Sequence, residues 1–288
     1  MIHSMEELIR ISEDKNHSIW ETILEDDMQD RSVSREESFA EMQGMYRAMK
    51  EADAGYDGKI TSASNLVGGD GARMEQAVQE ENVSSGPFIG KVMARAIKMG
   101  ESNACMKRIV AAPTAGSCGV IPAVFISFEE EFGYDEEKMT EALFVAAGIG
   151  SVIAERASIS GAQGGCQAEI GAASAMAAGG VTYLRGGNHS QIADAAAVAL
   201  KNLLGLVCDP VAGLVEVPCV KRNVIGAVNA ITSADMVMAG IKSKIPADEV
   251  IDAMGEIGNL LPSSLRETSQ AGLAVTPTGL AVTEHLTK

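Results

Sequence analysis

The feature that most constrains this chain is a long stretch, residues 145–220, that carries very little charge. Its 76 residues hold five acids and three bases and are dominated by Ala and Gly, as in Gly171-Ala-Ala-Ser-Ala-Met-Ala-Ala-Gly-Gly180. A helix that is apolar on every side is a buried helix, and small side chains let neighbouring helix backbones approach closely. Alternating β-branched residues are scarce and aromatic residues make up only 4%, so no series of strands is indicated. The sequence therefore predicts an all-α fold with buried, Ala/Gly-rich central helices.

The N-terminal part of the chain predicts charged helices that sheathe this core. Residues 1–51 hold 13 acids and 6 bases, with apolar residues at helical spacing. The run Ser34-Arg35-Glu36-Glu37 is a capping box, which predicts a helix from there through Met49. Because no linker divides the 288 residues, we expect one large helical domain, with residues 1–55 as its amphipathic N-terminal part.

Three further segments between the charged helices and the apolar stretch have local signals. Residues 55–71 are rich in Gly, Ser, Thr and Asn and predict a loop. A helix is expected over residues 87–99. Residues 109–112 fit either a short strand or the end of a helix.

The net charge and the cysteine content limit which classes of partner and which cellular compartment are expected. A net charge of −16 and a pI near 4.7 argue against nucleic acid and anionic membranes as partners, because both are polyanions. The N-terminus lacks a basic region followed by an apolar run, so no secretory signal is visible. The longest uncharged run, residues 109–128, contains prolines and glycines that would break a lipid-exposed helix. Five sparse cysteines indicate a reducing, cytoplasmic location rather than a disulfide framework.

Three of the cysteines, Cys166, Cys208 and Cys219, each stand close to Gly or Pro, where helices should begin or end. Backbone amides at such ends can hydrogen-bond to sulfur and stabilise a thiolate. The alternative is that they are small buried side chains that only pack. Their separations match no short zinc or ferredoxin pattern. Cys118 lies in a neighbouring turn and Cys105 has no motif around it, so neither is expected to bind a metal.

The amino-acid sequences around these cysteines are more specific than the spacing between them. The segments Ser158-Ile-Ser-Gly-Ala-Gln-Gly-Gly-Cys-Gln-Ala-Glu169, Gly205-Leu-Val-Cys-Asp-Pro-Val-Ala-Gly-Leu-Val-Glu-Val-Pro-Cys219 and Ala112-Pro-Thr-Ala-Gly-Ser-Cys-Gly-Val-Ile-Pro-Ala123 closely resemble the catalytic region of bacterial iron–sulfur-dependent L-serine dehydratases. The similarity includes Arg222-Asn223 and Arg266-Glu267-Thr268-Ser269. The length of this chain resembles that of the separate alpha subunit in two-subunit members of the family.

This resemblance implies a [4Fe–4S] cluster on Cys166, Cys208 and Cys219, with the fourth iron open to substrate. It implies the deamination of L-serine to pyruvate and ammonia, which would feed gluconeogenic metabolism. It also implies a smaller beta subunit as partner, because single-chain members carry an equivalent region ahead of the catalytic part. Some single-chain members end in a cysteine tail that can occupy the open iron, whereas this sequence ends in His285-Leu-Thr-Lys288.

Substrate binding requires hydrogen-bond donors for a carboxylate and an acceptor for an ammonium. Gly-rich turns with hydroxyl side chains offer such donors. The first candidates are Thr114, Ser117, Ser158 and Ser160, and the second are Ser62, Ser64 and Asn65. Thr114 and Ser160 could equally be helix caps. Glu169 fits either an acid/base group or, as we favour, a partner in a buried ion pair.

No histidine is an obvious general base. His3 and His17 belong to the charged N-terminal region and His285 to the end of the chain, and we expect His189 in a surface turn. A base supplied by the beta subunit is therefore expected.

Three other functions compete with serine dehydration by an iron–sulfur enzyme. A pyridoxal-phosphate enzyme needs a Schiff-base lysine, and residues 145–220 hold only Lys201, in an ordinary helical context. An iron–sulfur L-cysteine desulfidase and a non-catalytic metal-cluster scaffold remain as alternatives.

Overall fold

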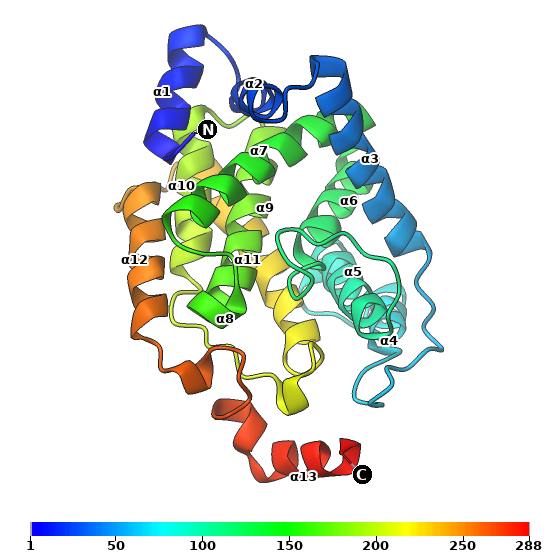
Figure 1. Cartoon of the computed structure of the whole chain (residues 1–288). Coiled ribbons are helices and arrows are strands. Elements are labelled where there is room, and N and C mark those ends of the chain that lie inside the picture. The colour runs from blue at the N-terminus through cyan, green and yellow to red at the C-terminus, as the bar shows by residue number, and fades with distance from the viewer. Residues whose placement is uncertain (1, 288) are drawn as a thin grey trace.

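The central helices of the molecule lie side by side and form its core. The computed structural model describes residues 2–287, and every regular element in that range is helical. Figure 1 shows α7 (Glu136–Arg156), α9 (Ala172–Leu184), α10 (His189–Lys201) and α11 (Cys219–Met238) running through the middle of the fold. The one β pairing among the described residues is an isolated bridge between Cys208 and Arg266. The prediction of an all-α fold is confirmed.

Helix α9 is the innermost of these helices. All its residues except Tyr183 are buried, and α6 (Val120–Phe132), α7, α10 and α11 pack around it. A Cβ added at Gly179 would lie 2.1 Å from Cδ1 of Ile149, and one added at Gly180 would lie 2.3 Å from Cζ of Phe125. Packed atoms do not approach that closely, so a larger residue at either position would force Ile149 or Phe125 to shift. The prediction of buried Ala/Gly-rich central helices is confirmed, and close helix contact is the reason for the composition.

Charged helices cover the ends and sides of this core. Helices α1 (Met5–Lys15), α2 (Ile19–Arg31) and α3 (Arg35–Ala54) form the N-terminal end. The pair α4 (Asp70–Gln79) and α5 (Gly86–Ala104) packs beside α6, and α12 (Ala247–Leu260) packs beside α10. Helix α13 (Pro277–Leu286) ends the described chain below the central helices in Figure 1. The short elements are α8 (Gly161–Gly164), the π-helical η1 (Gln167–Gly171), and the single-turn η2 (Val211–Gly213), η3 (Ser263–Leu265) and η4 (Gly272–Val275).

Several predicted boundaries need correction. The capping box at Ser34 and Glu37 is present, but α3 runs to Ala54, five residues beyond the expected end. Helix α5 extends beyond residues 87–99 at both ends, because its last turns are buried and continue the packed face. The loop expected over residues 55–71 is shorter, since α4 already begins at Asp70. Residues 109–112 form neither a strand nor a helix end.

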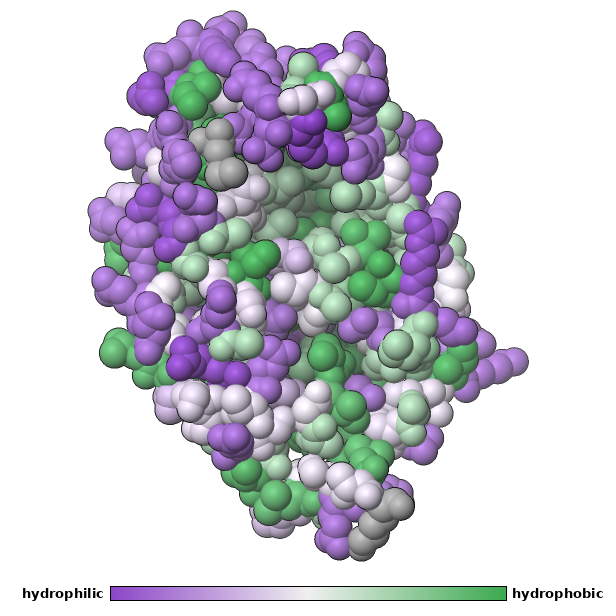
Figure 2. All heavy atoms as spheres, in the orientation of Figure 1, coloured by the Kyte–Doolittle hydropathy of each residue, from purple (hydrophilic) through white to green (hydrophobic). Residues whose placement is uncertain are grey.

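The two ends of the molecule differ in polarity. Figure 2 shows hydrophilic residues gathered over the α1–α3 end and more apolar surface toward α13. Within residues 2–287, no helix combines the length and the apolarity that crossing a bilayer requires. The uncharged run 109–128 becomes an irregular segment followed by the first part of α6.

Candidate active site

The structure brings Cys166, Cys208 and Cys219 together at one end of the central helices. Cys166 joins α8 to η1, Cys208 follows the turns after α10, and Cys219 is the first residue of α11. Cys166 and Cys208 are buried and Cys219 is half-buried. Besides burial, the charge of Cys166 raises the pKa of both Cys208 and Cys219, and the charge of Cys219 raises that of Cys208, so the three thiols lie close together. Side chains that are far apart in the sequence therefore share one site, here called the cysteine site.

Burial makes all three thiols weak acids. It raises the pKa of Cys166 to about 11, although the neighbouring Arg222 guanidinium acts against this rise. Burial and then the charge of Cys166 raise the pKa of Cys219 to about 12. The pKa of Cys208 is raised by burial and then by the charges of Cys166 and Glu169. Each thiol keeps its proton at neutral pH in the absence of a cation, and a bound metal would displace these protons.

Arg222 of α11 connects the segments that carry the cysteines. Its guanidinium contacts the Cys166 thiol and donates to the Val207 carbonyl at 2.7 Å and to Oδ1 of Asp209 at 2.8 Å. Asp209, buried itself, also accepts the Leu273 N–H at 2.8 Å. This ion pair sits directly after Cys208, so it fixes the backbone that presents that thiol.

Gln167 fixes the Cys166 segment in a similar way. The side chain is fully buried, accepts the Gly205 N–H at 2.8 Å and donates to the Met254 carbonyl at 3.1 Å. Its own N–H donates to the Leu206 carbonyl at 2.9 Å. One amide side chain therefore ties the residue after Cys166 to the turn before Cys208 and to α12.

Asn223 joins the loop 113–119 to the start of α11. Its Oδ1 accepts the Gly119 N–H at 2.8 Å, and its Nδ2 donates to the carbonyls of Gly116 at 2.9 Å and Cys219 at 3.0 Å. Because a buried amide with unmade hydrogen bonds is costly, these three bonds set the position of the loop relative to Cys219.

Glu169 lies beside the cysteine site without a cationic partner. Its Oε1 accepts from the Thr114 hydroxyl at 2.9 Å, and no ion pair within residues 2–287 includes it. Burial raises the pKa of this carboxyl, the Thr114 hydrogen bond lowers it, and the Glu267 charge raises it. A Cβ at Gly161 would lie 2.6 Å from Glu169 Oε2 and 3.1 Å from Cys208 Sγ, so glycine leaves the space that both groups use. The favoured prediction of a buried ion pair is wrong, because no Lys or Arg among the described residues pairs with this carboxylate.

The hydroxyl candidates for substrate binding fall into three places. Thr114 and Ser117 hydrogen-bond to each other at 3.0 Å beside Glu169, so Thr114 does not cap a helix. Ser158 donates to Oε1 of Gln163 at 2.8 Å. Ser160 precedes α8 but makes no side-chain capping bond.

The second group of candidates, Ser62, Ser64 and Asn65, lies in the loop before α4. The Ser62 and Ser64 hydroxyls both donate to Oε2 of Glu216, at 2.8 and 2.5 Å. Glu216 is buried three residues before Cys219. Asn65 is exposed, adopts a φ of +61° and accepts from the Thr61 hydroxyl at 3.3 Å. The two serines therefore hold a carboxylate of the protein itself.

The remaining cysteines and the histidines stand apart from these groups. Cys118 is fully buried and donates to the Met99 carbonyl at 3.7 Å, while Cys105 follows the last turn of α5. His3 contacts Glu155 and His17 contacts Glu25, and His189 opens α10 rather than lying in a surface turn. His285 is in the last turn of α13.

Within the described chain, no three His, Cys, Asp or Glu side chains form a ready-made shell for a single metal ion. Ligands of one zinc ion crowd around bonds of about 2.3 Å, whereas the cysteines of an iron–sulfur cube are spread around a larger group. Three converging thiols, a glycine beside Cys208 Sγ and a guanidinium beside Cys166 line this site.

Three residues that build this site were not predicted from the sequence. Gln167, Asp209 and Glu216 are polar residues within the nearly uncharged stretch 145–220. A polar side chain in such a stretch must find a partner when it is buried, and that was the available signal. The partners themselves are remote in the sequence and left no local pattern.

The fold and the site define an all-helical protein with a largely buried site lined by thiols. A model of the serine dehydratase alpha chain family matches residues 14–274. The chain belongs to this family, and the resemblance found in the sequence is confirmed.

Individual relatives agree over nearly the whole chain. The probable L-serine dehydratase, alpha chain, of Bacillus subtilis is 47% identical over 280 residues, which cover 97% of this chain and 93% of that protein. The L-serine dehydratase, alpha chain, of Peptoniphilus asaccharolyticus is 37% identical over 289 residues, covering 100% and 99%. L-serine dehydratase TdcG of Escherichia coli is 37% identical over 278 residues, which cover 95% of this chain but only 61% of that protein.

Proposed function

We propose that this chain is the catalytic chain of an L-serine dehydratase, which converts L-serine to pyruvate and ammonia and so supplies gluconeogenic metabolism. The observation that carries this proposal is the convergence of Cys166, Cys208 and Cys219, in a chain whose relatives are named L-serine dehydratases. Loss of water and of the Cα proton gives aminoacrylate, which tautomerises to an imine and hydrolyses to the two products.

The three cysteines would hold a [4Fe–4S] cluster in this proposal. When bound, the cluster would supply a Lewis acid that polarises the poorly leaving serine hydroxyl. Arg222 would keep the Cys166 segment in place through its bonds to Val207 and Asp209. Activity should fall in air and return with ferrous iron and reductant, and air-stable activity that follows pyridoxal phosphate would overturn the cofactor.

Glu169 is the group of this chain best placed to carry a proton. It has no cationic partner, accepts one hydrogen bond from Thr114, and lies among the thiols. We assign it the acid/base role that the histidines do not fill. A base from the partner chain remains the competing assignment, and the two are separated by the Glu169 variant described in the Discussion.

A beta chain is proposed as the partner. Relatives of similar length carry the name alpha chain, and this chain covers only 61% of the longer TdcG protein. Several large apolar residues near the C-terminus are exposed, among them Leu273, Val275 and Leu280. We also propose a cytoplasmic location, since such a cluster requires reducing conditions.

The deciding experiment is an anaerobic reconstitution of the purified chain, with and without its beta chain, followed by a pyruvate assay. We expect turnover of L-serine that needs both iron and the beta chain. Full activity of the iron-free chain would refute the cluster, and no turnover by the complete assembly would refute the dehydratase.

A further inference from the structure

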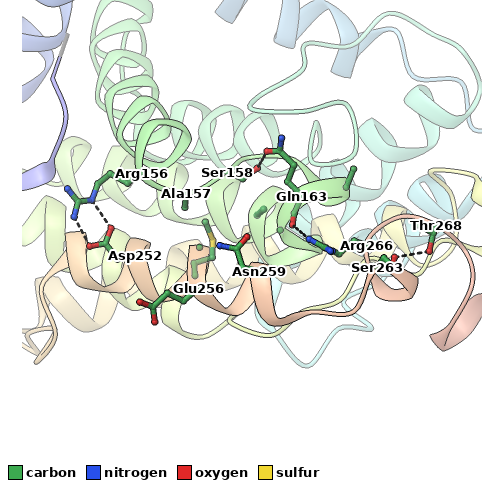
Figure 3. Close-up of a pocket in the computed structure, with 15 residues that line it drawn as sticks. Arg156, Ala157, Ser158, Gln163, Asp252, Glu256, Asn259, Ser263, Arg266 and Thr268 are labelled. Atoms are coloured by element: carbon green, nitrogen blue, oxygen red, sulfur yellow. Dashed lines mark hydrogen bonds and ion pairs between the residues drawn. The ribbon is translucent and has the colours of Figure 1, made fainter.

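A pocket of the described chain lies against the cysteine site. Its volume is about 770 Å³, and it is lined by the end of α7, by α8 and α12, and by residues of the segment 263–268. Figure 3 shows the side chains that reach it from these elements. The polar ones used below are Arg156, Gln163, Asp252, Asn259 and Arg266. Ala162, Gly164 and Ala168, from the segments around Cys166, line part of the pocket, so it lies against the cysteine site.

The two arginines of this pocket differ in their hydrogen-bond partners. Arg156 makes two hydrogen bonds to Asp252, at 3.0 and 2.7 Å. Arg266 has no acidic partner among the described residues, and the one hydrogen bond of its side chain is a long one of 3.3 Å to the Gln163 carbonyl. Its Nε is buried and has no acceptor at all. A buried N–H without an acceptor is unfavourable, so the Nε of Arg266 lacks a partner that an anion in the pocket would supply.

The backbone holds Arg266 in place beside Cys208. The Cys208 N–H donates to the Leu265 carbonyl at 2.9 Å, and the Glu267 N–H donates to the Cys208 carbonyl at 2.8 Å. Glu267 and Ser269 have φ values of +65° and +55°, a left-handed conformation that is costly for residues other than glycine. Such conformations persist where the surrounding structure enforces them, and they cluster at ligand sites.

We propose that this pocket is the substrate-recognition site and that Arg266 binds the carboxylate of the amino-acid substrate. This assignment rests on the proposed function and adds a specificity residue to it. A guanidinium binds a carboxylate through two parallel N–H···O bonds, and Nε is one of the donors available for that geometry. The hydroxyls of Ser62, Ser64 and Thr114 are already bonded to protein carboxylates, so they are poor donors for a second one. The Nε of Arg266, in contrast, has no acceptor in the structure.

The test compares Arg266→Met and Arg266→Lys with Arg47→Met in the anaerobically assembled enzyme. Arg47 is an exposed arginine paired with Glu136 and serves as a matched control. We expect Arg266→Met to raise the KM for L-serine about 10- to 100-fold with little change in kcat, as loss of a charged hydrogen bond implies. Arg266→Lys should fall between, and guanidinium ion added in solution should partly restore Arg266→Met.

Calorimetric titration supplies a readout that does not depend on turnover. L-Alanine keeps the carboxylate but cannot be dehydrated, whereas serinol lacks the carboxylate. The wild-type enzyme should bind L-alanine more tightly than serinol, and Arg266→Met should lose this preference while its thermal unfolding stays close to that of Arg47→Met.

An unchanged KM and an unchanged preference for L-alanine in a folded Arg266→Met enzyme would overturn the assignment. Failure of the wild type to make pyruvate would instead overturn the proposed function, and the L-alanine titration would still decide whether Arg266 binds a carboxylate.

Discussion

The helices around α9 and the segments around the thiols are joined by different kinds of contact. Around α9, helices meet through Ala, Gly and a few large apolar side chains, without a buried charge in α9 itself. Around the thiols, short irregular segments meet through buried polar groups, namely Gln167, Asp209, Glu216 and Asn223. The packing around α9 depends on side-chain volume, whereas the segments around the thiols depend on complete hydrogen bonding. The two regions should therefore respond differently to small substitutions.

The largest effect should come from removing a thiol. Each of Cys166→Ser, Cys208→Ser and Cys219→Ser should abolish L-serine turnover and lower the iron content of the reconstituted chain. Cys105→Ser is the matched control, because that cysteine lies outside the site at the end of α5. Iron content equal to that of the control in all three variants would contradict the assignment of these ligands.

Removing the carboxylate of Glu169 should have the next largest effect. Glu169→Gln keeps the size and the Thr114 hydrogen bond but cannot accept a proton, so kcat should fall about 100-fold or more. The iron content and the visible spectrum should stay as in the wild type. A kcat within a few-fold of wild type would favour a base supplied by the partner chain.

The packing around α9 is tested by a single methyl group. Gly180→Ala places a Cβ 2.3 Å from Phe125, which should destabilise the fold by about 1–3 kcal/mol. Gly44→Ala in α3 is the control with the opposite sign, since nothing lies within 4 Å of its added Cβ and alanine favours an exposed helix by up to about 1 kcal/mol. Equal midpoints of thermal unfolding in the two variants would show that α9 is not tightly packed.

The smallest effect should come from the hydroxyls that hold Glu216. Ser62→Ala and Ser64→Ala each remove one hydrogen bond to this buried carboxylate, and each should lower the free energy of unfolding by about 1 kcal/mol. The exposed Ser190→Ala should change it by less. If instead Ser62→Ala raised the KM for L-serine tenfold at unchanged stability, this loop would be part of the substrate site after all.

These contrasts explain how far the sequence could predict the structure. Residues 145–220 predicted the fold because a long run of small uncharged residues has few uses other than close helix packing. The neighbours of Cys166, Cys208 and Cys219 identified the family, and the structure places those cysteines together. Ser62 and Ser64 could not be interpreted, because a hydroxyl that faces a ligand and one that faces Glu216 look the same in a sequence. The lack of an acidic partner for Arg266 could not be predicted either, since it depends on which Asp and Glu side chains the fold brings close to it.

Because of its composition, α9 should be especially sensitive to substitutions that enlarge a side chain. In an ordinary core most substitutions shorten a side chain and leave a void, which neighbours can partly fill. Most residues of α9 are already Ala, Gly or Ser, so almost every substitution there enlarges a side chain. Overfilling cannot be relieved by local collapse, and the neighbouring backbones have to separate instead. In a saturation library, α9 should therefore show intolerance that follows the volume of the new residue rather than its polarity.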